Sequence, residues 1–301
     1  MEATRTFFLA MAKNQAARSL ATKYGLRFGA KRFVAGETLT EALEQIKRLN
    51  RDGIVATLDR LGEFVSTKEE AERAAGWALE TVEGIAHSGV QSHLSIKLTQ
   101  LGLDLGEDVC EANVRRILHK AKLHGIFVRM DMEDFPRCQT TVDLFEKMHA
   151  EFPLTGLVIQ SYLFRSETDV LNLKTNLRLV KGAYKEPSTV AFPEKAKVDE
   201  NLITLIKHQL DNGWYVAVAS HDDKIIAWTK EYVKKNNVSK DKFEFQMLYG
   251  IKTEMQKKLA QEGYRVRIYV PYGTDWYGYF MRRLAERPAN IWFIMKNFFK
   301  K

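Results

Sequence analysis

Residues 279–286 place four polar side chains on one face of a predicted helix. Tyr279, Arg282, Arg283 and Glu286 fall at i, i+3, i+4 and i+7, the spacing at which residues share a helix face. Two adjacent guanidinium groups on an inward face can bind a carboxylate or a phosphate through paired hydrogen bonds. The same spacing also fits a solvated face with an i,i+4 ion pair. The chemistry of these residues therefore depends on where the helix lies.

Short apolar runs alternate with longer helical patterns through most of the chain. Eight runs are typical of strands: Ile54–Leu58, His93–Leu98, Ile126–Asp131, Gly156–Gln160, Leu177–Lys181, Tyr215–Ala219, Phe243–Met247 and Val266–Val270. The helical patterns between them are Lys68–His87, Glu111–His124, Gln139–Phe152, Lys195–Asn212, Lys224–Asn236 and Thr253–Glu262, and Ser161–Leu173 must supply a short helix. This alternation predicts parallel strands with crossover helices. Eight units predict an α/β fold of the (β/α)8 TIM barrel type rather than an open sheet. No GxGxxG motif follows the first strand, which argues against a Rossmann domain.

The chain divides into three predicted segments. Residues 1–50 form an N-terminal helical segment, with helices expected at Ala16–Leu20 and Thr40–Leu49. Residues 51–290 form the barrel, which is the catalytic domain, and residues 291–301 form an amphipathic C-terminal helical tail rich in aromatic and basic residues. This tail fits either a final helix packed on the barrel or an element that contacts a membrane surface or a partner.

Composition narrows the class of protein. The 301 residues carry a formal net charge of +8, which suits an anionic cofactor or an anionic membrane surface. Nucleic acid is not expected as a partner, because the basic residues are scattered and no recognition motif is present. The two cysteines form no CxxC pair and no metal-ligand spacing, which fits a reducing compartment. No apolar run approaches the ~18 residues of a membrane span. We expect a cytoplasmic protein and leave open a peripheral contact with the inner face of the cell membrane.

Polar residues follow most of the predicted strands. In a (β/α)8 barrel the strand ends meet at one rim, where the active sites of this fold lie. The residues at these ends include Asp59, Lys97, Asp131, Gln160, Arg178, Lys181, Gly182, Tyr184, Ser220, His221, Gln246, Leu248 and Tyr269, and the last strand leads into the helix with the two arginines. Such a collection predicts the concave site of an enzyme.

Several of these residues fit more than one role. Lys97 interrupts an apolar run, which is costly unless it meets an anion or its pKa is lowered. Asp131 ends a strand and is expected in the pocket, whereas Glu133 and Asp134 are expected in a solvated loop. A metal site at these carboxylates is disfavoured by the many nearby cations and by the absence of a suitably spaced histidine. His221 fits either a structural hydrogen bond or a role in the site.

Five strings together resemble proline dehydrogenases, a family of flavin-dependent enzymes with a distorted (β/α)8 barrel. The strings are Ser95–Leu98, Arg178–Tyr184, Phe245–Gly250, Arg267–Gly273 and Tyr279-x-x-Arg282-Arg283-x-x-Glu286, in the order of the family. The resemblance covers roughly residues 50–290, and the chain length resembles the monofunctional bacterial form.

The resemblance implies roles for individual residues. It implies that the substrate is bound by Lys97, Tyr184, Leu248, Tyr269, Tyr279, Arg282 and Arg283. It implies catalytic roles for Asp131, in the pocket, and for Arg178, beside the flavin N5. It implies contacts with FAD from Met130, Gln160, Arg178, Val180, Lys181, Gly182, Ala183, Ser220, His221 and Glu286, and it implies no metal.

Three positions depart from the family pattern. Ser220 stands where many relatives have threonine, and the Val198-Asp199 pair lacks a threonine that some branches carry. Lys185 replaces the tryptophan of the bifunctional branch. The change at Ser220 is mild, and all three positions fall on the expected cofactor site.

The function that the resemblance implies is the oxidation of L-proline to Δ1-pyrroline-5-carboxylate by hydride transfer to N5 of FAD. It is the first step of proline catabolism to glutamate, with electrons passed on to a membrane quinone. The product could be handed over to a pyrroline-5-carboxylate dehydrogenase. The acceptor of the amine proton is left open. Two alternatives remain at this stage: a Schiff-base or metal-dependent lyase with Lys97 as nucleophile, and a barrel that serves only as a binding module.

Overall fold

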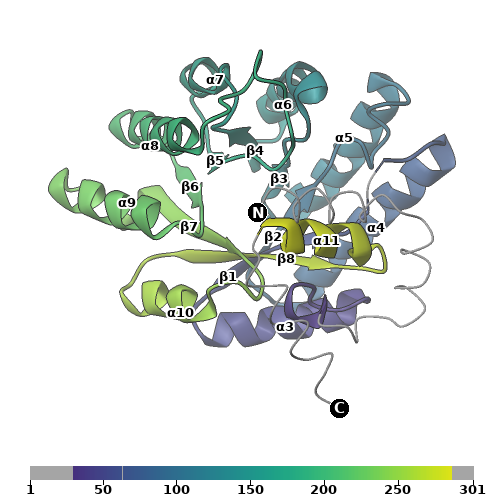
Figure 1. The fold of residues 1–301 in the computed structure, drawn as a ribbon. Helices are drawn as coiled ribbons and strands as arrows, with labels where there is room; N and C mark the ends of the chain where they lie inside the picture. Colours follow the sequence, from purple (N-terminus) through teal and green to yellow (C-terminus); the bar gives the residue numbers. More distant parts are fainter. Residues whose placement is uncertain (1–29, 63, 287–301) are drawn as a thin grey trace.

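The structure is a closed barrel of eight parallel strands. It is a computed structural model that describes residues 30–62 and 64–286. Each strand pairs with the next along the chain, and β8 pairs back to β1 (Figure 1). The strands are β1 Val55–Arg60, β2 Ser92–Ile96, β3 Val128–Met130, β4 Thr155–Gln160, β5 Leu177–Val180, β6 Val216–Ala219, β7 Phe243–Leu248 and β8 Val266–Tyr272. All eight overlap the predicted runs, and the predicted barrel is confirmed.

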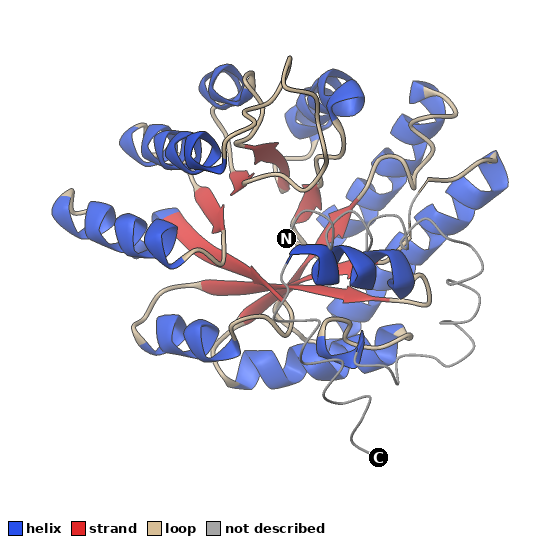
Figure 2. Cartoon of the chain, viewed as in Figure 1, coloured by secondary structure: helices blue, strands red, loops and turns tan. Residues whose placement is uncertain are grey.

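Helices surround the barrel (Figure 2). They are α3 Leu39–Arg51, α4 Lys68–Ser88, α5 Glu107–Leu123, α6 Cys138–Glu151, α7 Ser166–Leu173, α8 Lys195–Asp211, α9 Asp223–Lys235, α10 Thr253–Gln261 and α11 Trp276–Glu286, with short 3-10 turns η2 Ala30–Arg32, η3 Phe135–Arg137 and η4 Lys240–Lys242. The short fourth crossover helix is present as α7. The predicted helix at 40–49 is α3.

Local sequence signals fix where several helices begin and end. Capping boxes start α3, through Thr38 and Glu41, and α4, through Thr67 and Glu70. Each box satisfies backbone N–H groups that have no partner within the helix. The glycine that ends α4, Gly89, has a φ of 66°, in the left-handed region that favours glycine.

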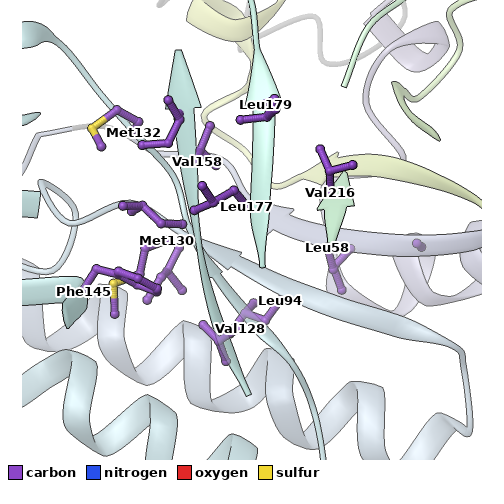
Figure 3. Packing of buried hydrophobic residues seen from close by; sticks show 14 of the residues in the cluster. Leu58, Leu94, Val128, Met130, Met132, Phe145, Val158, Leu177, Leu179 and Val216 are labelled. Carbon is purple, nitrogen blue, oxygen red and sulfur yellow. The ribbon is translucent and has the colours of Figure 1, made fainter. Parts of the chain in front are cut away.

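Alternation along the strands separates two layers of side chains. Residues that point outward form the apolar layer between strands and helices, and Figure 3 shows members of it, among them Leu58, Leu94 and Val128. Their sequence neighbours point into the barrel, because successive strand residues face opposite sides. Hydrogen bonds between non-adjacent strands confirm this, since Arg178 Nη1 on β5 donates to Ser95 Oγ on β2 at 3.2 Å.

The interior of this barrel is unusually polar. Barrels of this type are commonly filled by layers of branched apolar side chains. Here the inward residues include Asp59, Ser95, Lys97, Arg129, Asp131, Arg178, Glu244, Gln246, Arg267 and Tyr269. Buried charges of this kind are stable only when they are paired and hydrogen-bonded.

Some predictions fall outside the described residues. These are the helix at Ala16–Leu20, the tail at 291–301 and the side chain of Glu286. The three-segment division therefore stays a prediction. Within residues 30–62 and 64–286, no helix is long and apolar enough to cross a membrane.

Gly156 provides a test of the crowded interior. A Cβ at this position would lie 2.4 Å from Arg129 Nη1 and 2.7 Å from Phe127 Cζ. Arg129 cannot move freely, because its guanidinium donates to the backbone oxygens of Leu157 and Asn176 at 3.1 and 2.8 Å. We expect Gly156→Ala to lower the free energy of unfolding by about 1–3 kcal/mol, as overpacking does.

Gly76 in α4 is the matched control. A Cβ there would meet no atom within 4 Å. Gly76→Ala should therefore stabilise the protein by about 0.5–1 kcal/mol through helix propensity. Urea denaturation of both variants measures the two changes. Equal stability of the two variants would contradict the tight packing of Gly156 against Arg129.

Candidate active site

One large cavity opens at the carboxyl ends of the strands. Its volume is about 1330 Å³, above the ~300–1,000 Å³ of common small-molecule sites. The walls come from β1 and from β4 to β8, from the segments that follow the strands, and from α4 and α11. The volume suits a ligand larger than an amino acid, or a small substrate together with a cofactor.

Most of the predicted site residues line this cavity. They are Lys97, Asp131, Gln160, Arg178, Val180, Lys181, Gly182, Ala183, Tyr184, Ser220, His221, Leu248, Tyr269, Tyr279, Arg282 and Arg283. The structure thus brings together residues that lie as far apart in sequence as 97 and 283. What each of them binds remains a proposal.

Met130 is the described residue that the structure does not bring to the cavity. Its side chain is fully buried in the apolar layer outside the barrel. The reason is strand alternation, because Arg129 and Asp131 on either side of it point inward. Met132 lines the cavity in its place.

Helix α11 closes one side of the cavity and directs its polar face inward. Tyr279, Arg282 and Arg283 all line the cavity, and Arg283 is only 8% exposed. The Arg283 guanidinium lies 5.1 Å from the centre of the Tyr279 ring. The adjoining face of the helix packs Phe280 against Phe33, with Trp276 in the same apolar cluster. The solvated-face interpretation of this helix is therefore wrong for the two arginines.

Lys97 lies at the centre of a group of buried polar side chains. Its Nζ donates to Asp59 Oδ1 at 2.9 Å, to Asp131 Oδ2 at 3.3 Å and to the Tyr269 hydroxyl at 3.1 Å. Burial opposes the charged form of Lys97, but Asp59, Tyr269 and Asp131 outweigh it and hold the pKa of Lys97 well above its usual value. Lys97 is therefore an ammonium ion.

Asp131 is the most heavily hydrogen-bonded carboxylate of the group. Its Oδ1 accepts from Ser95 Oγ at 2.9 Å and from Arg178 Nη1 at 2.8 Å. Its Oδ2 accepts from Lys97 and, at 2.8 Å, from the Tyr269 hydroxyl. Burial favours the neutral acid, but Lys97 and Arg178 outweigh it and lower the pKa of Asp131. Asp131 is therefore ionised.

A chain of hydrogen bonds extends from Arg178 towards the bottom of the barrel. Arg178 Nε donates to Gln246 Oε1 at 2.6 Å, and Gln246 Nε2 donates to Glu244 Oε1 at 2.5 Å. Glu244 also accepts from Arg267 Nε at 2.8 Å. Burial favours a neutral Glu244, but Arg267 outweighs it and lowers the pKa of this carboxyl. The chain holds Arg178 in one orientation from below.

The rim after β5 and β6 carries a lysine paired with two aspartates, and it has an unusual backbone. Lys181 Nζ contacts Asp222 at 2.7 Å and Asp199 at 2.5 Å. The Lys181 ammonium is the main cause that lowers the pKa of Asp222 to about 2. Gly182 has a φ of 114°, and a Cβ there would lie 2.4 Å from the Tyr162 ring. Only glycine fits this position, which leaves its backbone open to the cavity.

His221 has a structural contact as well as a place on the cavity wall. Its Nε2 accepts a hydrogen bond from the backbone N–H of Leu248 at 2.9 Å. A neutral His221 ring therefore carries its proton on Nδ1. The two interpretations left open by the sequence are compatible in this geometry.

The carboxylates that follow Asp131 do not join it. Glu133 is buried, and it accepts from Thr99 N at 3.0 Å and Thr99 Oγ1 at 2.6 Å, so the prediction of a solvated Glu133 is wrong. Asp134 pairs with Arg137 at 2.6 Å on the loop, half-buried. Among the described residues, no group of three or more His, Cys, Asp and Glu side chains is placed to hold a metal ion.

Two strand-end residues of the polar group were given no individual role from the sequence. Asp59 and Gln246 lie near the ends of β1 and β7 on the inward side, and both line the cavity. Their positions at strand ends were visible in the sequence, but their partners were not. Strand alternation, counted from Asp131 and Arg178 as inward residues, was the signal that could have selected them.

Comparisons with known proteins match this geometry. A sequence model of the family described as proline dehydrogenase matches residues 42–296. The chain belongs to the proline dehydrogenase family. It is 49% identical to proline dehydrogenase 1 of Bacillus subtilis (strain 168) over 99% of both chains. It is 45% identical to proline dehydrogenase of Deinococcus radiodurans over 90% of both chains.

Larger bifunctional proteins contain a related region. The chain is 25% identical to the bifunctional protein PutA of Escherichia coli (strain K12), of which the match covers 24%. A crystal structure of PutA from Bdellovibrio bacteriovorus, inactivated by N-propargylglycine, superposes with a TM-score of 0.82 and 28% identity. That match covers 90% of this chain and 34% of the other. The chain thus corresponds to the monofunctional proline dehydrogenases along its full length.

Proposed function

We propose that this member of the proline dehydrogenase family oxidises L-proline to Δ1-pyrroline-5-carboxylate with FAD as the oxidant, as the first step of proline catabolism to glutamate. One observation carries the proposal. The arginine pair of α11 lines the same cavity as Arg178 and the Lys181–Gly182 rim. A carboxylate-binding fork, together with a rim where the Gly182 backbone lies open, suits an amino acid beside a nucleotide cofactor.

The residues present fit FAD. Gln160 Oε1 and Arg178 Nη2 are buried polar atoms at the cavity that have no hydrogen-bond partner among the described residues. Buried polar groups normally have partners, so these two atoms suit the polar edge of a bound ring system. The open backbone at Gly182 and the ammonium of Lys181 suit a diphosphate. The residues proposed to hold FAD are Gln160, Arg178, Val180, Lys181, Gly182, Ala183, Ser220 and His221, with Glu286 proposed on family resemblance alone.

When bound, FAD supplies an N5 atom that accepts a hydride from the substrate. The protein supplies the position of the substrate. Arg282 and Arg283 bind its carboxylate, with the ammonium of Lys97 nearby, and such fixing contributes several kcal/mol of the lowering of the barrier. Leu248, Tyr184, Tyr269 and Tyr279 surround the ring. Arg178, held by Gln246 from below, stabilises negative charge that develops beside it.

The contacts of Lys97 count against a Schiff-base lyase. An amine nucleophile must lose its proton before it attacks a carbonyl. Lys97 is instead held as an ammonium ion by two carboxylates. The intact set of cavity residues likewise counts against a barrel that only binds.

We also propose that the electrons pass to a membrane quinone and that the protein is cytoplasmic, with peripheral contact at the inner face of the cell membrane. The product carries a reactive imine, which water opens to an aldehyde that a pyrroline-5-carboxylate dehydrogenase would oxidise next. The aromatic and basic tail at 291–301 is the segment suited to membrane contact.

Deletion of residues 291–301 tests the membrane contact. We expect the folded deletion variant to lose binding to anionic liposomes, because the tail supplies both apolar and basic side chains. Co-sedimentation measures the change, and the melting temperature of the variant controls for folding. Undiminished binding by a folded variant would contradict the role of the tail.

The visible spectrum tests cofactor, substrate and reaction together. We expect the purified protein to be yellow, with a flavin band that L-proline bleaches under anaerobic conditions. D-Proline is the control for the geometry of the clamp. A colourless protein, or a flavin band that L-proline leaves unchanged, would contradict the proposed function.

Arg282→Met tests the carboxylate fork. We expect the KM for proline to rise by at least about 100-fold, since charge-assisted bidentate pairs contribute about 3 kcal/mol or more when desolvated. The flavin content should stay unchanged. Arg116→Met, on α5 and remote from the cavity, controls for the loss of a helical arginine. An ordinary KM in Arg282→Met would remove this residue from the substrate site.

A further inference from the structure

The proposed oxidation leaves one proton without an acceptor. An amino acid enters as a zwitterion, and its ammonium must lose a proton before the nitrogen lone pair can form a C=N bond. A base for this step must lie at the cavity and must have an acceptor site that the protein does not already use.

Asp131 has no such site. A carboxylate offers about four acceptor positions on its two oxygens. In Asp131 these are taken by Ser95 and Arg178 on Oδ1 and by Lys97 and Tyr269 on Oδ2. A new hydrogen bond from a substrate would have to displace one of them.

Lys97 has no acceptor site either. An ammonium group has three donors and no acceptor. Its three donors are directed to Asp59, Asp131 and Tyr269. Lys97 can therefore hold carboxylates in place, but it cannot receive a proton.

Asp59 is different. Its Oδ1 accepts one hydrogen bond, from Lys97 at 2.9 Å. The Tyr269 hydroxyl also lies near Asp59, but it has a single proton, and that proton is donated to Asp131 at 2.8 Å. Within the described part of the chain, Asp59 thus keeps acceptor capacity. It lines the cavity, although it is only 1% exposed.

The surroundings separate the two carboxylates in their affinity for a proton. Burial is the main cause that raises the pKa of Asp59, whereas Asp131 has its pKa lowered by Lys97 and Arg178. Two carboxylates whose environments push their pKa values apart are typical of acid–base pairs. The charged and titratable groups that face Asp59 are Lys97 from β2, Asp131 from β3, Tyr269 from β8 and, across the cavity, Arg178 from β5 and Arg282 and Arg283 from α11.

We propose that Asp59 is the base that takes the proton from the substrate ammonium. The inference rests on the proposed function. The N–H bond of the ammonium breaks, an O–H bond forms on Asp59, and the free amine is left with its lone pair. With the lone pair free to form the C=N bond of an iminium ion, the C–H hydrogen next to nitrogen would leave as a hydride to the bound oxidant. Asp59 returns its proton to solvent when the product leaves.

Asp59→Asn tests this role, because it keeps the size of the side chain and removes the base. We expect the anaerobic rate of flavin bleaching at neutral pH to fall by about 100-fold or more, within the range for general-base catalysis. In the variant the rate should rise about tenfold per pH unit, as free amine becomes available from solution. In the unaltered protein the bleaching rate should stop rising at a pH well below the pKa of the amine.

A second substrate separates proton transfer from structural damage. 4,4-Difluoroproline has a less basic amine. The ratio of the bleaching rate of the unaltered protein to that of Asp59→Asn should therefore be smaller with this substrate than with proline. Cyclopentanecarboxylate, which has no amine, should perturb the flavin spectrum of both proteins at the same concentration. Thr57→Val, two residues earlier on β1, controls for the loss of a buried polar group from the same strand.

The outcomes are distinct. An equal loss of rate at every pH and with both substrates, or weaker binding of cyclopentanecarboxylate, would assign Asp59 a structural role and overturn the proposal. If Asp59→Asn does not fold, Asp59→Glu, which keeps the base, is the second variant. Its bleaching rate should also stop rising well below the pKa of the proline amine. A rate in Asp59→Glu that keeps rising up to the pKa of the amine would overturn the proposal. Absence of bleaching in the unaltered protein would instead contradict the proposed function itself.

Discussion

The ammonium of Lys97, held between two carboxylates, is the interaction on which the barrel interior depends. Each ion taken from water into a protein interior costs several kcal/mol, and attraction repays this only when geometry and hydrogen bonding are complete. Lys97 meets Asp59 at 2.9 Å and Asp131 at 3.3 Å, with Tyr269 as a third partner. Removing one member of such a group leaves an unpaired buried charge, which typically costs 3–5 kcal/mol. The strands that carry these residues must therefore stay in register.

This pairing extends through the barrel instead of ending at its mouth. Arg178 shares Asp131 with Lys97, and it is fixed from below by Gln246, which Glu244 and Arg267 fix in turn. An apolar filling would have been simpler to stabilise. The polar filling has a different advantage, because each group at the cavity is oriented before any ligand arrives.

The fold was predictable because it depends on patterns that are local in sequence. All eight strands overlap apolar runs, and α3 and α4 begin at capping boxes that a few positions encode. The rim was predictable because strand order and the parallel topology determine it. The resemblance to a family then selected most of the cavity residues.

What could not be predicted depends on contacts between distant strands. Glu133 reads as a loop carboxylate, and only the approach of Thr99 explains its burial. Met130 was assigned to the cavity by resemblance, although its place between two inward residues already directs it to the outer layer. Sequence shows that Asp59 ends a strand, but not that Lys97 lies 2.9 Å away.

The distribution of charge explains how such a site could select a zwitterion. The α11 face offers two guanidinium groups to a carboxylate, while the β1 side offers Asp59, a carboxylate that retains acceptor capacity. A molecule with both charges would satisfy both sides and add no net charge to a water-poor cavity. A simple carboxylic acid would leave the remaining acceptor position of Asp59 unfilled, and a simple amine would make no use of the two guanidinium groups. Since buried polar groups are costly unless they are hydrogen-bonded, selectivity would follow from the separation of the two sides. The Lys97 ammonium maintains that separation, because it keeps Asp59 and Asp131 on one wall without neutralising both of them.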